Sequence, residues 1–434
     1  MTSIVESSKR RHRSFKEFQL SLTGHELAPK LGTMRTRQPH LNRSRMFTSA
    51  LGLVALGSLL PILGALIYLY WHGTGGFDFW SGYLTAANHL THGQSPYNPI
   101  LLSGPVPVGN DHGFVYPPTL AWLLIPFLAL PQNVASLIWL VLQAGAASLG
   151  LIILVRALRA SFQPRLIFLL IIALVSFPPF ISLCYSGNVT GFIALGMALL
   201  LRSALRDETG GASSGPIGAI LAVLKLTPGL VLLPLVIADP RRHLPRALLT
   251  GLMLTIPFIL LNPGAWLDFA HIPFNLAAGS SWNANVLGPA TALPYHWSIF
   301  ASWTTALHVL TLGLTAVLVL AAMALARQKN GLPAALVAAS GAAILPFGEI
   351  WLYYLAALLP GLILAYFWAG RSGRAAIILG YLLLWGGLAV SFPLASLGML
   401  VLMFVPVFIL CPSTLTFGRH TFNLKNKPKM DMAD

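Results

Sequence analysis

The sequence predicts an all-α protein that crosses a membrane several times. Of its 434 residues, 56% are hydrophobic and only 9% are charged, whereas about a quarter of a typical soluble domain is charged. Apolar runs of about 20 residues recur along the chain, and that length spans a bilayer as a helix. The short alternating segments of a membrane β-barrel are missing from this pattern.

The formal net charge of +15 comes from lysines and arginines that cluster in the two tails and in short loops. This distribution follows the positive-inside rule, so we expect a multi-pass protein of the inner (plasma) membrane with both termini in the cytoplasm. The charge is then explained by membrane orientation and by anionic lipid head groups, and no nucleic-acid partner is expected. The two cysteines, Cys184 and Cys411, are far apart in or beside apolar runs, so neither a disulfide nor a metal site is expected.

We expect three regions: a basic cytoplasmic tail over 1–45, one membrane domain over 46–411, and a second basic tail over 412–434. The first tail has no apolar stretch near its start, which argues against a cleaved signal peptide. No internal repeat and no second domain are evident.

The apolar segments are expected, in chain order, at 46–71, 114–131, 133–156, 166–184, 189–204, 216–238, 245–261, 298–326, 332–369, 375–391 and 394–411. The segment 114–131 is short and rich in proline, so it should form a broken element. The segment 332–369 is interrupted at 346–349 and should form two helices that meet outside. The connections 72–117 and 262–297 should be long outer loops, and the first carries a helical pattern in its first half.

The segment 216–238 is unusual because Lys225 and Pro228 interrupt it and arginines flank both of its ends. Two cytoplasmic flanks are incompatible with a single crossing. We therefore expect a re-entrant hairpin of two half-helices with Lys225 near its tip. Broken helices are tolerated inside membranes where they line a cavity.

Two charged residues are the first candidates for chemistry. Asp78 lies among Phe77, Phe79 and Trp80 at the start of the first outer loop. It is either a helix cap or interfacial acid, or a sheltered carboxylate suited to take a proton from a hydroxyl. Lys225 either extends to a lipid head group or binds an anion such as phosphate in a buried site.

Other polar residues are weaker candidates. Glu349 either pairs with Lys225, binds sugar hydroxyls or caps the following helix. Tyr353 and Tyr354 either stack on a sugar or belong to an interfacial aromatic belt. His89 and His92 have no third ligand at a suitable spacing, so no metal is expected.

The stretch from Asp78 to Tyr97 resembles the signature of glycosyltransferase family 87, whose members are membrane enzymes of the GT-C type. The matching residues are Asp78, Phe79, Tyr83, Ala86, Ala87, Leu90, Gly93, Pro96 and Tyr97. Further matches follow in the family's order at Tyr116-Pro117-Pro118, Gly187-Asn188, Lys225-x-x-Pro228 and Asn283-Ala284-Asn285. The sequence departs from the family where Trp351, Tyr353 and Tyr354 stand in place of a tryptophan and a histidine pair.

The resemblance implies a GT-C-like bundle of about 10 to 13 transmembrane or re-entrant helices with a helical first outer loop. It implies transfer of a hexose, mannose in many relatives, from a polyprenyl-phosphate donor to a lipid-linked or cell-envelope glycan, with inversion and no cofactor. Asp78 would be the general base and Lys225 would hold the donor phosphate. The other substrate-binding residues would be Tyr83, Tyr116, Asn188, Asn283, Asn285, Glu349, Tyr353 and Tyr354.

Two other functions remain open from the sequence. A lipid or solute transporter or flippase would use Lys225 as its anion site, but would be expected to show inverted repeats. A non-catalytic subunit of a membrane assembly would tolerate the loss of the Asp78 carboxylate.

Overall fold

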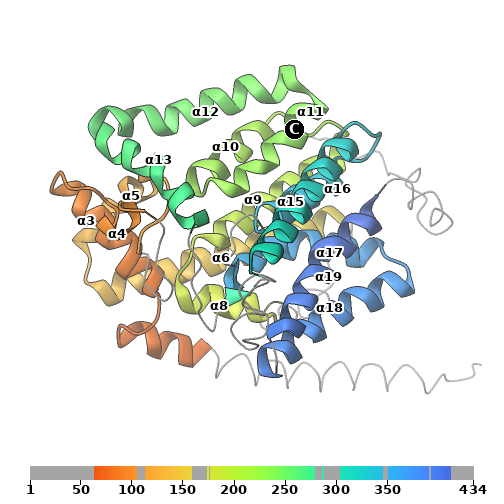
Figure 1. Cartoon of the computed structure of the whole chain (residues 1–434), viewed down its shortest axis with the longest axis horizontal. Helices are drawn as coiled ribbons and strands as arrows, with labels where there is room; N and C mark the ends of the chain where they lie inside the picture. The colour runs from red at the N-terminus through yellow and green to blue at the C-terminus, as the bar shows by residue number, and fades with distance from the viewer. Residues whose placement is uncertain are drawn as a thin grey trace, which may run out of the picture. The chain divides into compact units, whose positions relative to one another are not determined.

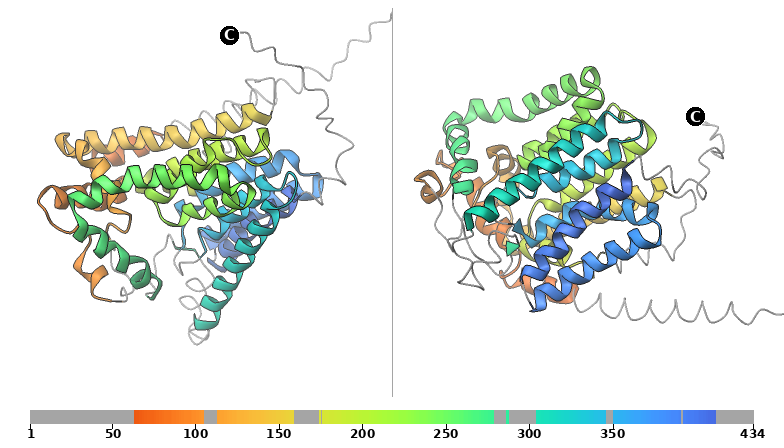
Figure 2. Two further views of the ribbon diagram at one scale, coloured as in Figure 1. Left: turned by 90° about the horizontal axis from the view of Figure 1, so that it is seen from above. Right: turned by 45° about the vertical axis from the view of Figure 1, so that its right-hand side comes forward.

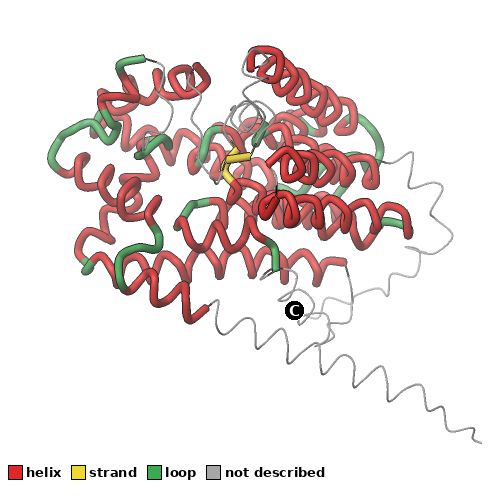
Figure 3. The backbone as a smooth tube through the Cα atoms, turned by 60° about the horizontal axis from the view of Figure 1, so that its bottom comes forward, coloured by secondary structure: helices red, strands yellow, loops and turns green. Residues whose placement is uncertain are grey.

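The computed structural model describes residues 63–104, 113–158, 174, 176–278, 286–287, 304–345, 350–390 and 392–411. Helices make up nearly all regular structure in these ranges (Figure 3). Residues 63–71 are helical and belong to the first predicted membrane segment. Both predicted basic tails, 1–45 and 412–434, lie outside the described residues.

Three helices in the described part of the chain are long and apolar enough to cross a membrane: α6 (Gln132–Leu158), α12 (Pro240–Leu261) and the stretch Val309–Ala326. Helix α12 carries an outward apolar face, on which Leu248 is 55% exposed and Leu260 is 76% exposed. Such a face is unfavourable in water and favourable against lipid tails. Together with several shorter apolar helices, these features confirm an all-α polytopic membrane protein.

The first loop is helical, as its sequence pattern predicts. Its elements are η1 (Asp78–Leu84), α3 (Thr85–Thr91) and α4 (Pro99–Leu102). The segment that follows contains α5 (Pro118–Leu124) and η2 (Ile125–Ala129). Helix η1 is a π-helix, which the sequence did not predict. The predicted break within 114–131 is confirmed, because α5 ends at Leu124 and a 3₁₀-helix follows it.

The next elements follow the first loop region, and α6 packs directly against η1 and η2. They are α6, α8 (Pro178–Ser186) and α9 (Thr190–Arg206). Helices α6 and α9 approach closely at two glycines. A Cβ on Gly150 would lie 2.9 Å from Leu195 Cα, and one on Gly191 would lie 2.4 Å from the Gln143 carbonyl oxygen. Small residues permit such close helix packing in membranes.

The predicted interruption at Lys225 is confirmed. The elements are α10 (Ser214–Leu224), η3 (Thr227–Val231) and α11 (Leu232–Ala238). Lys225 has an extended backbone with φ −157° and ψ 126°, and Pro228 follows at the start of η3. An 11-residue helix such as α10 is about 17 Å long, which is short of the roughly 30 Å hydrocarbon core.

The predicted loop over 262–297 begins instead with a helix, α13 (Pro263–Ala278). Proline is favourable in the first turn of a helix, and the Asn262 side chain accepts a hydrogen bond from the Ala265 N–H at 3.1 Å. Helix α13 packs against α4. The Asn275 side chain donates to the Leu101 carbonyl at 2.6 Å.

The C-terminal part contains β1 (Val286–Leu287), α15 (Thr304–Ala326), α16 (Leu332–Ala342), β2 (Ile350–Trp351), η5 (Leu352–Leu358), α17 (Leu359–Trp368), α18 (Arg371–Val390) and α19 (Phe392–Leu410). Strands β1 and β2 pair antiparallel, with Val286 opposite Trp351. Helices α18 and α19 lie side by side, as do α15 and α16 (Figure 1 and Figure 2).

The polar loop after α9 is tied to the start of α12. Arg242 Nη1 donates to Asp207 at 2.7 Å and to the Gly210 carbonyl at 3.0 Å. The backbone N–H and hydroxyl of Thr209 also donate to Asp207. The hydrogen bonds from Thr209, with those from Arg242, hold the pKa of Asp207 below its ordinary value.

We therefore predict that Asp207→Asn lowers the unfolding temperature at neutral pH. A lowered native pKa means that the ionised carboxylate stabilises the fold above its ordinary pKa of about 4, and that this contribution is lost as the pH falls through the lower native value. The difference in unfolding temperature between wild type and variant should therefore become smaller in that acidic range. Thermal unfolding of the two proteins across pH measures it, with Glu208→Gln at the exposed neighbouring acid as control. A difference in unfolding temperature that does not change with pH would contradict a lowered native pKa for Asp207.

Candidate active site

Asp78 is the first residue of η1 and is half-buried. The N-cap of this helix is Phe77 and not Asp78. The Asp78 carboxylate accepts a hydrogen bond at 2.8 Å from the side-chain amide of Asn188, 110 residues later in the chain. Phe79 is fully buried and stacks on Trp139 with ring centroids 4.8 Å apart. The acid is thus held at the edge of an aromatic cluster.

The Asn188 side chain connects η1, the loop before α5 and the start of α9, and it is fully buried. Its Nδ2 donates to Asp78 at 2.8 Å and to the Tyr116 hydroxyl at 2.7 Å. Its Oδ1 accepts from the Thr190 hydroxyl at 2.7 Å and from the Thr190 N–H at 3.2 Å. These bonds fix which end of the amide faces the carboxylate. The sequence marks Asn188 as a candidate, but nothing in it reveals that Thr190 orients the amide.

Gly187 places Asn188 by ending α8 with φ 77°, a left-handed conformation. A Cβ here would lie 3.0 Å from Gly76 Cα and 3.2 Å from Phe79 Cβ. The Trp139 indole N–H donates to the Gly187 carbonyl at 2.6 Å. The turn, the start of η1 and α6 therefore meet at a point where only glycine fits without strain.

Two buried tyrosines, Tyr83 and Tyr116, pack beside Asn188. The Tyr83 ring lies edge-on to the Tyr116 ring, with centroids 5.1 Å apart, and both residues are buried. The Val189 N–H donates to the Tyr83 hydroxyl at 3.2 Å. The Tyr116 backbone carbonyl accepts from the Tyr97 hydroxyl at 2.8 Å. Both predicted tyrosines thus belong to the cluster that carries Asp78.

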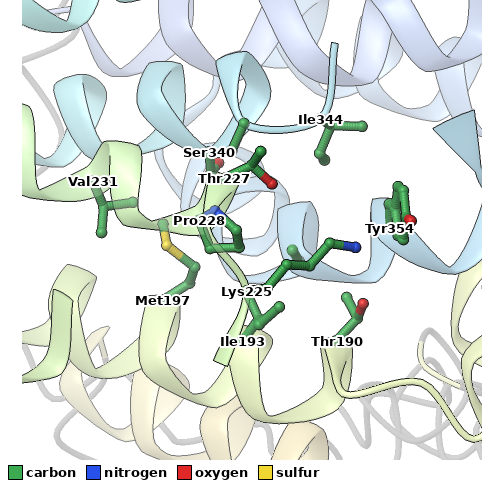
Figure 4. A pocket seen from close by; sticks show the side chains of 12 residues that line it. Thr190, Ile193, Met197, Lys225, Thr227, Pro228, Val231, Ser340, Ile344 and Tyr354 are labelled. Carbon is green, nitrogen blue, oxygen red and sulfur yellow. The ribbon is translucent and has the colours of Figure 1, made fainter. Parts of the chain in front are cut away.

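Lys225 lines a pocket, and its side chain extends towards Tyr354 (Figure 4). The pocket has an empty volume of about 430 Å³, its opening included. Its wall is mainly apolar and includes Ile193, Met197 and Val231. The ammonium lies 5.4 Å from the centroid of the Tyr116 ring and 3.3 Å from that of Tyr354.

The acid and the cation are therefore brought to one cluster. Asp78 reaches Tyr116 through Asn188, and the Lys225 ammonium lies over the Tyr116 ring. The two opposite charges also attract each other electrostatically. The pocket is lined by Lys225 and by Thr190, whose hydroxyl bonds to Asn188, the partner of Asp78. A carboxylate and an ammonium joined through one cluster can act on one substrate, the first on a hydroxyl proton and the second on an anionic group.

The remaining predicted residues fall into two groups. Tyr353 is buried and packs edge-on to Tyr354 with centroids 4.9 Å apart. Glu349, Asn283 and Asn285 lie outside the described residues. Among the residues that the structure describes, no group of three His, Cys, Asp or Glu side chains could hold a metal ion.

We predict that Gly187→Ala lowers stability more than Gly93→Ala. Gly93 has a similar φ of 71°, but no atom lies within 4 Å of a Cβ built there. Both substitutions carry the strain of a left-handed backbone, about 1 kcal/mol, and only the change at Gly187 also forces atoms of η1 apart. Thermal unfolding of both variants measures the difference, and equal losses would show that the close approach carries no cost.

Comparison with known proteins gives one result. The model of glycosyltransferase family 87 matches residues 114–353, which is more than half of the chain. No curated protein and no solved structure matches it. The match includes Tyr116, Asn188 and Lys225, and it begins after Asp78. The chain is a membrane glycosyltransferase and belongs to glycosyltransferase family 87.

Proposed function

We propose that the protein transfers a hexose, mannose being our first choice, from a polyprenyl-phosphate donor to a hydroxyl of a lipid-linked or cell-envelope glycan. The observation that carries this proposal is the convergence of Asp78 and Lys225 on the cluster around Tyr116 and Asn188. Family membership supports the sugar transfer itself. The apolar pocket beside Lys225 supports a donor with a lipid portion.

In this mechanism Asp78 is the general base. Its carboxylate takes the proton of the acceptor hydroxyl, and the hydroxyl oxygen forms a bond to the anomeric carbon of the donor sugar. The bond from that carbon to the phosphate oxygen breaks, and its electron pair leaves with the polyprenyl phosphate. Attack from the face opposite the phosphate inverts the configuration. Asn188 holds the carboxylate in place, which favours positioning of the two reactants.

Lys225 stabilises the leaving group. Negative charge develops on the phosphate as the bond breaks, and a positive charge in a mainly apolar pocket stabilises it more than it would in bulk water. Tyr116 lies between the two sides, since it accepts a hydrogen bond from Asn188 and its ring faces the Lys225 ammonium, and Tyr83 packs edge-on against it. The mechanism assigns no step to a metal or cofactor. Asn283, Asn285 and Glu349 stay as predicted sugar contacts.

We place this reaction at the outer face of the inner (plasma) membrane, with both tails in the cytoplasm. The support is the concentration of basic residues in the tails and in the short loops. A transporter that uses Lys225 as an anion site is disfavoured by the family match, and it would not require Asp78.

We predict that Asp78→Asn abolishes transfer and keeps donor binding. The amide has nearly the same shape but cannot accept the proton, so turnover should fall by at least about 10²- to 10⁴-fold. Purified protein in lipid nanodiscs is incubated with a panel of polyprenyl-phosphate hexoses and acceptors, and products are read by mass spectrometry. Asp268→Asn is the matched control, because Asp268 is also half-buried and accepts a hydrogen bond, from Ser95. Turnover of Asp78→Asn close to that of wild type would refute the general-base role.

We also predict that Lys225→Met weakens donor binding. Methionine keeps an unbranched apolar chain and loses the charge, so the loss of a charge-assisted contact to phosphate should cost about 10-fold or more in affinity. Binding of polyprenyl-phosphate mannose is measured by isothermal titration. Lys329→Met, at an exposed lysine after α15, should leave affinity unchanged. Unchanged affinity in Lys225→Met would remove this residue from the phosphate site.

A further inference from the structure

The Lys225 ammonium rests on the face of an aromatic ring. Its Nζ lies 3.3 Å from the centroid of Tyr354, and Figure 4 shows the lysine side chain extended towards that residue. The Tyr116 ring is a second, more distant neighbour at 5.4 Å. An ammonium over a ring face is attracted by the negative face of the ring quadrupole, and this attraction grows where water is excluded.

The surroundings make this contact important for Lys225. The rest of the pocket wall is mainly apolar, with the hydroxyl residues Thr190, Thr227 and Ser340 among it. The Ser340 hydroxyl already donates to the Val337 carbonyl at 2.8 Å. In such a place a cation is costly unless protein groups offset the loss of water.

The position of Tyr354 is fixed by its own element. Tyr354 lies in the 3₁₀-helix η5, which follows the paired strand β2 directly. Tyr353 packs against it edge-on at 4.9 Å. Helix η5 also packs on α8 and α9, the helices that flank Asn188. The ring is therefore anchored to the same framework as the carboxylate side of the cluster.

We propose that Tyr354 is a positioning residue for Lys225: its ring holds the ammonium at the pocket wall, oriented towards the place where the donor phosphate binds. The inference rests on the proposed function of Lys225. It assigns the ring face of Tyr354 to the lysine, so this tyrosine is not the platform on which the sugar stacks. Tyr354 acts on the reaction only through the cation.

The test is a double-mutant cycle. Tyr354→Leu and Tyr354→Phe are made in wild type and in Lys225→Met, and binding of polyprenyl-phosphate mannose is measured together with KM and kcat. We expect Tyr354→Leu to weaken donor binding about tenfold and Tyr354→Phe to stay close to wild type, because phenylalanine keeps the ring face. In the Lys225→Met background, Tyr354→Leu should cause no further loss.

A second measurement avoids any loss of folding. Phenylalanine analogues with increasing numbers of fluorine atoms are placed at position 354, where they keep the ring shape and progressively weaken its negative face. Donor affinity should fall stepwise with fluorination. The control matched to Tyr354→Leu is Tyr366→Leu, because the Tyr366 ring also faces a cation, Arg374 at 5.5 Å, but on the exposed surface. Tyr366→Leu should leave donor affinity unchanged.

The outcomes separate this inference from the proposed function. If Lys225→Met alone leaves donor affinity unchanged, the phosphate role of Lys225 fails and this inference fails with it. If Lys225→Met weakens binding while fluorination has no effect, only the role of Tyr354 is overturned. Equal losses from Tyr354→Leu in both backgrounds would show that the ring supports the fold and does not position the lysine.

Discussion

The arrangement of this site follows from the cost of holding charge among apolar helices. An ammonium or a carboxylate removed from water needs protein partners, or the fold loses several kcal/mol. The Lys225 ammonium contacts two tyrosine rings, and the Asp78 carboxylate accepts a hydrogen bond from the amide of Asn188. Each partner comes from a different part of the chain. The same contacts that make the charges tolerable therefore bring the first loop, the α8–α9 turn and η5 together.

Asn188 is the connecting residue of the cluster. Its amide nitrogen joins the carboxylate to Tyr116, and its oxygen is occupied by Thr190 at the start of α9. Because α9 packs closely on α6 through Gly150 and Gly191, this amide is attached to a tightly packed pair of helices. A carboxylate held in this way loses little freedom when a substrate binds, which is the condition for efficient positioning.

Much of this could be predicted from the sequence, for identifiable reasons. Lys225 and Pro228 mark the broken helix, because a charge and a missing N–H both disfavour a continuous apolar span. The aromatic residues on both sides of Asp78 identify it as a sheltered carboxylate. The helix α13 was missed because prolines and asparagines are common in loops, although they also start helices. The contact between Lys225 and Tyr354 joins residues 129 positions apart and depends on packing that no local pattern encodes.

In the proposed reaction the acid and the cation act on one substrate from two sides. The decisive experiment is an experimental structure with a non-hydrolysable polyprenyl-phosphate hexose bound in lipid nanodiscs. We expect the donor phosphate in contact with the Lys225 ammonium, and the anomeric carbon between that phosphate and the Asp78 carboxylate. A phosphate bound away from Lys225, or a sugar whose anomeric carbon faces away from Asp78, would contradict it.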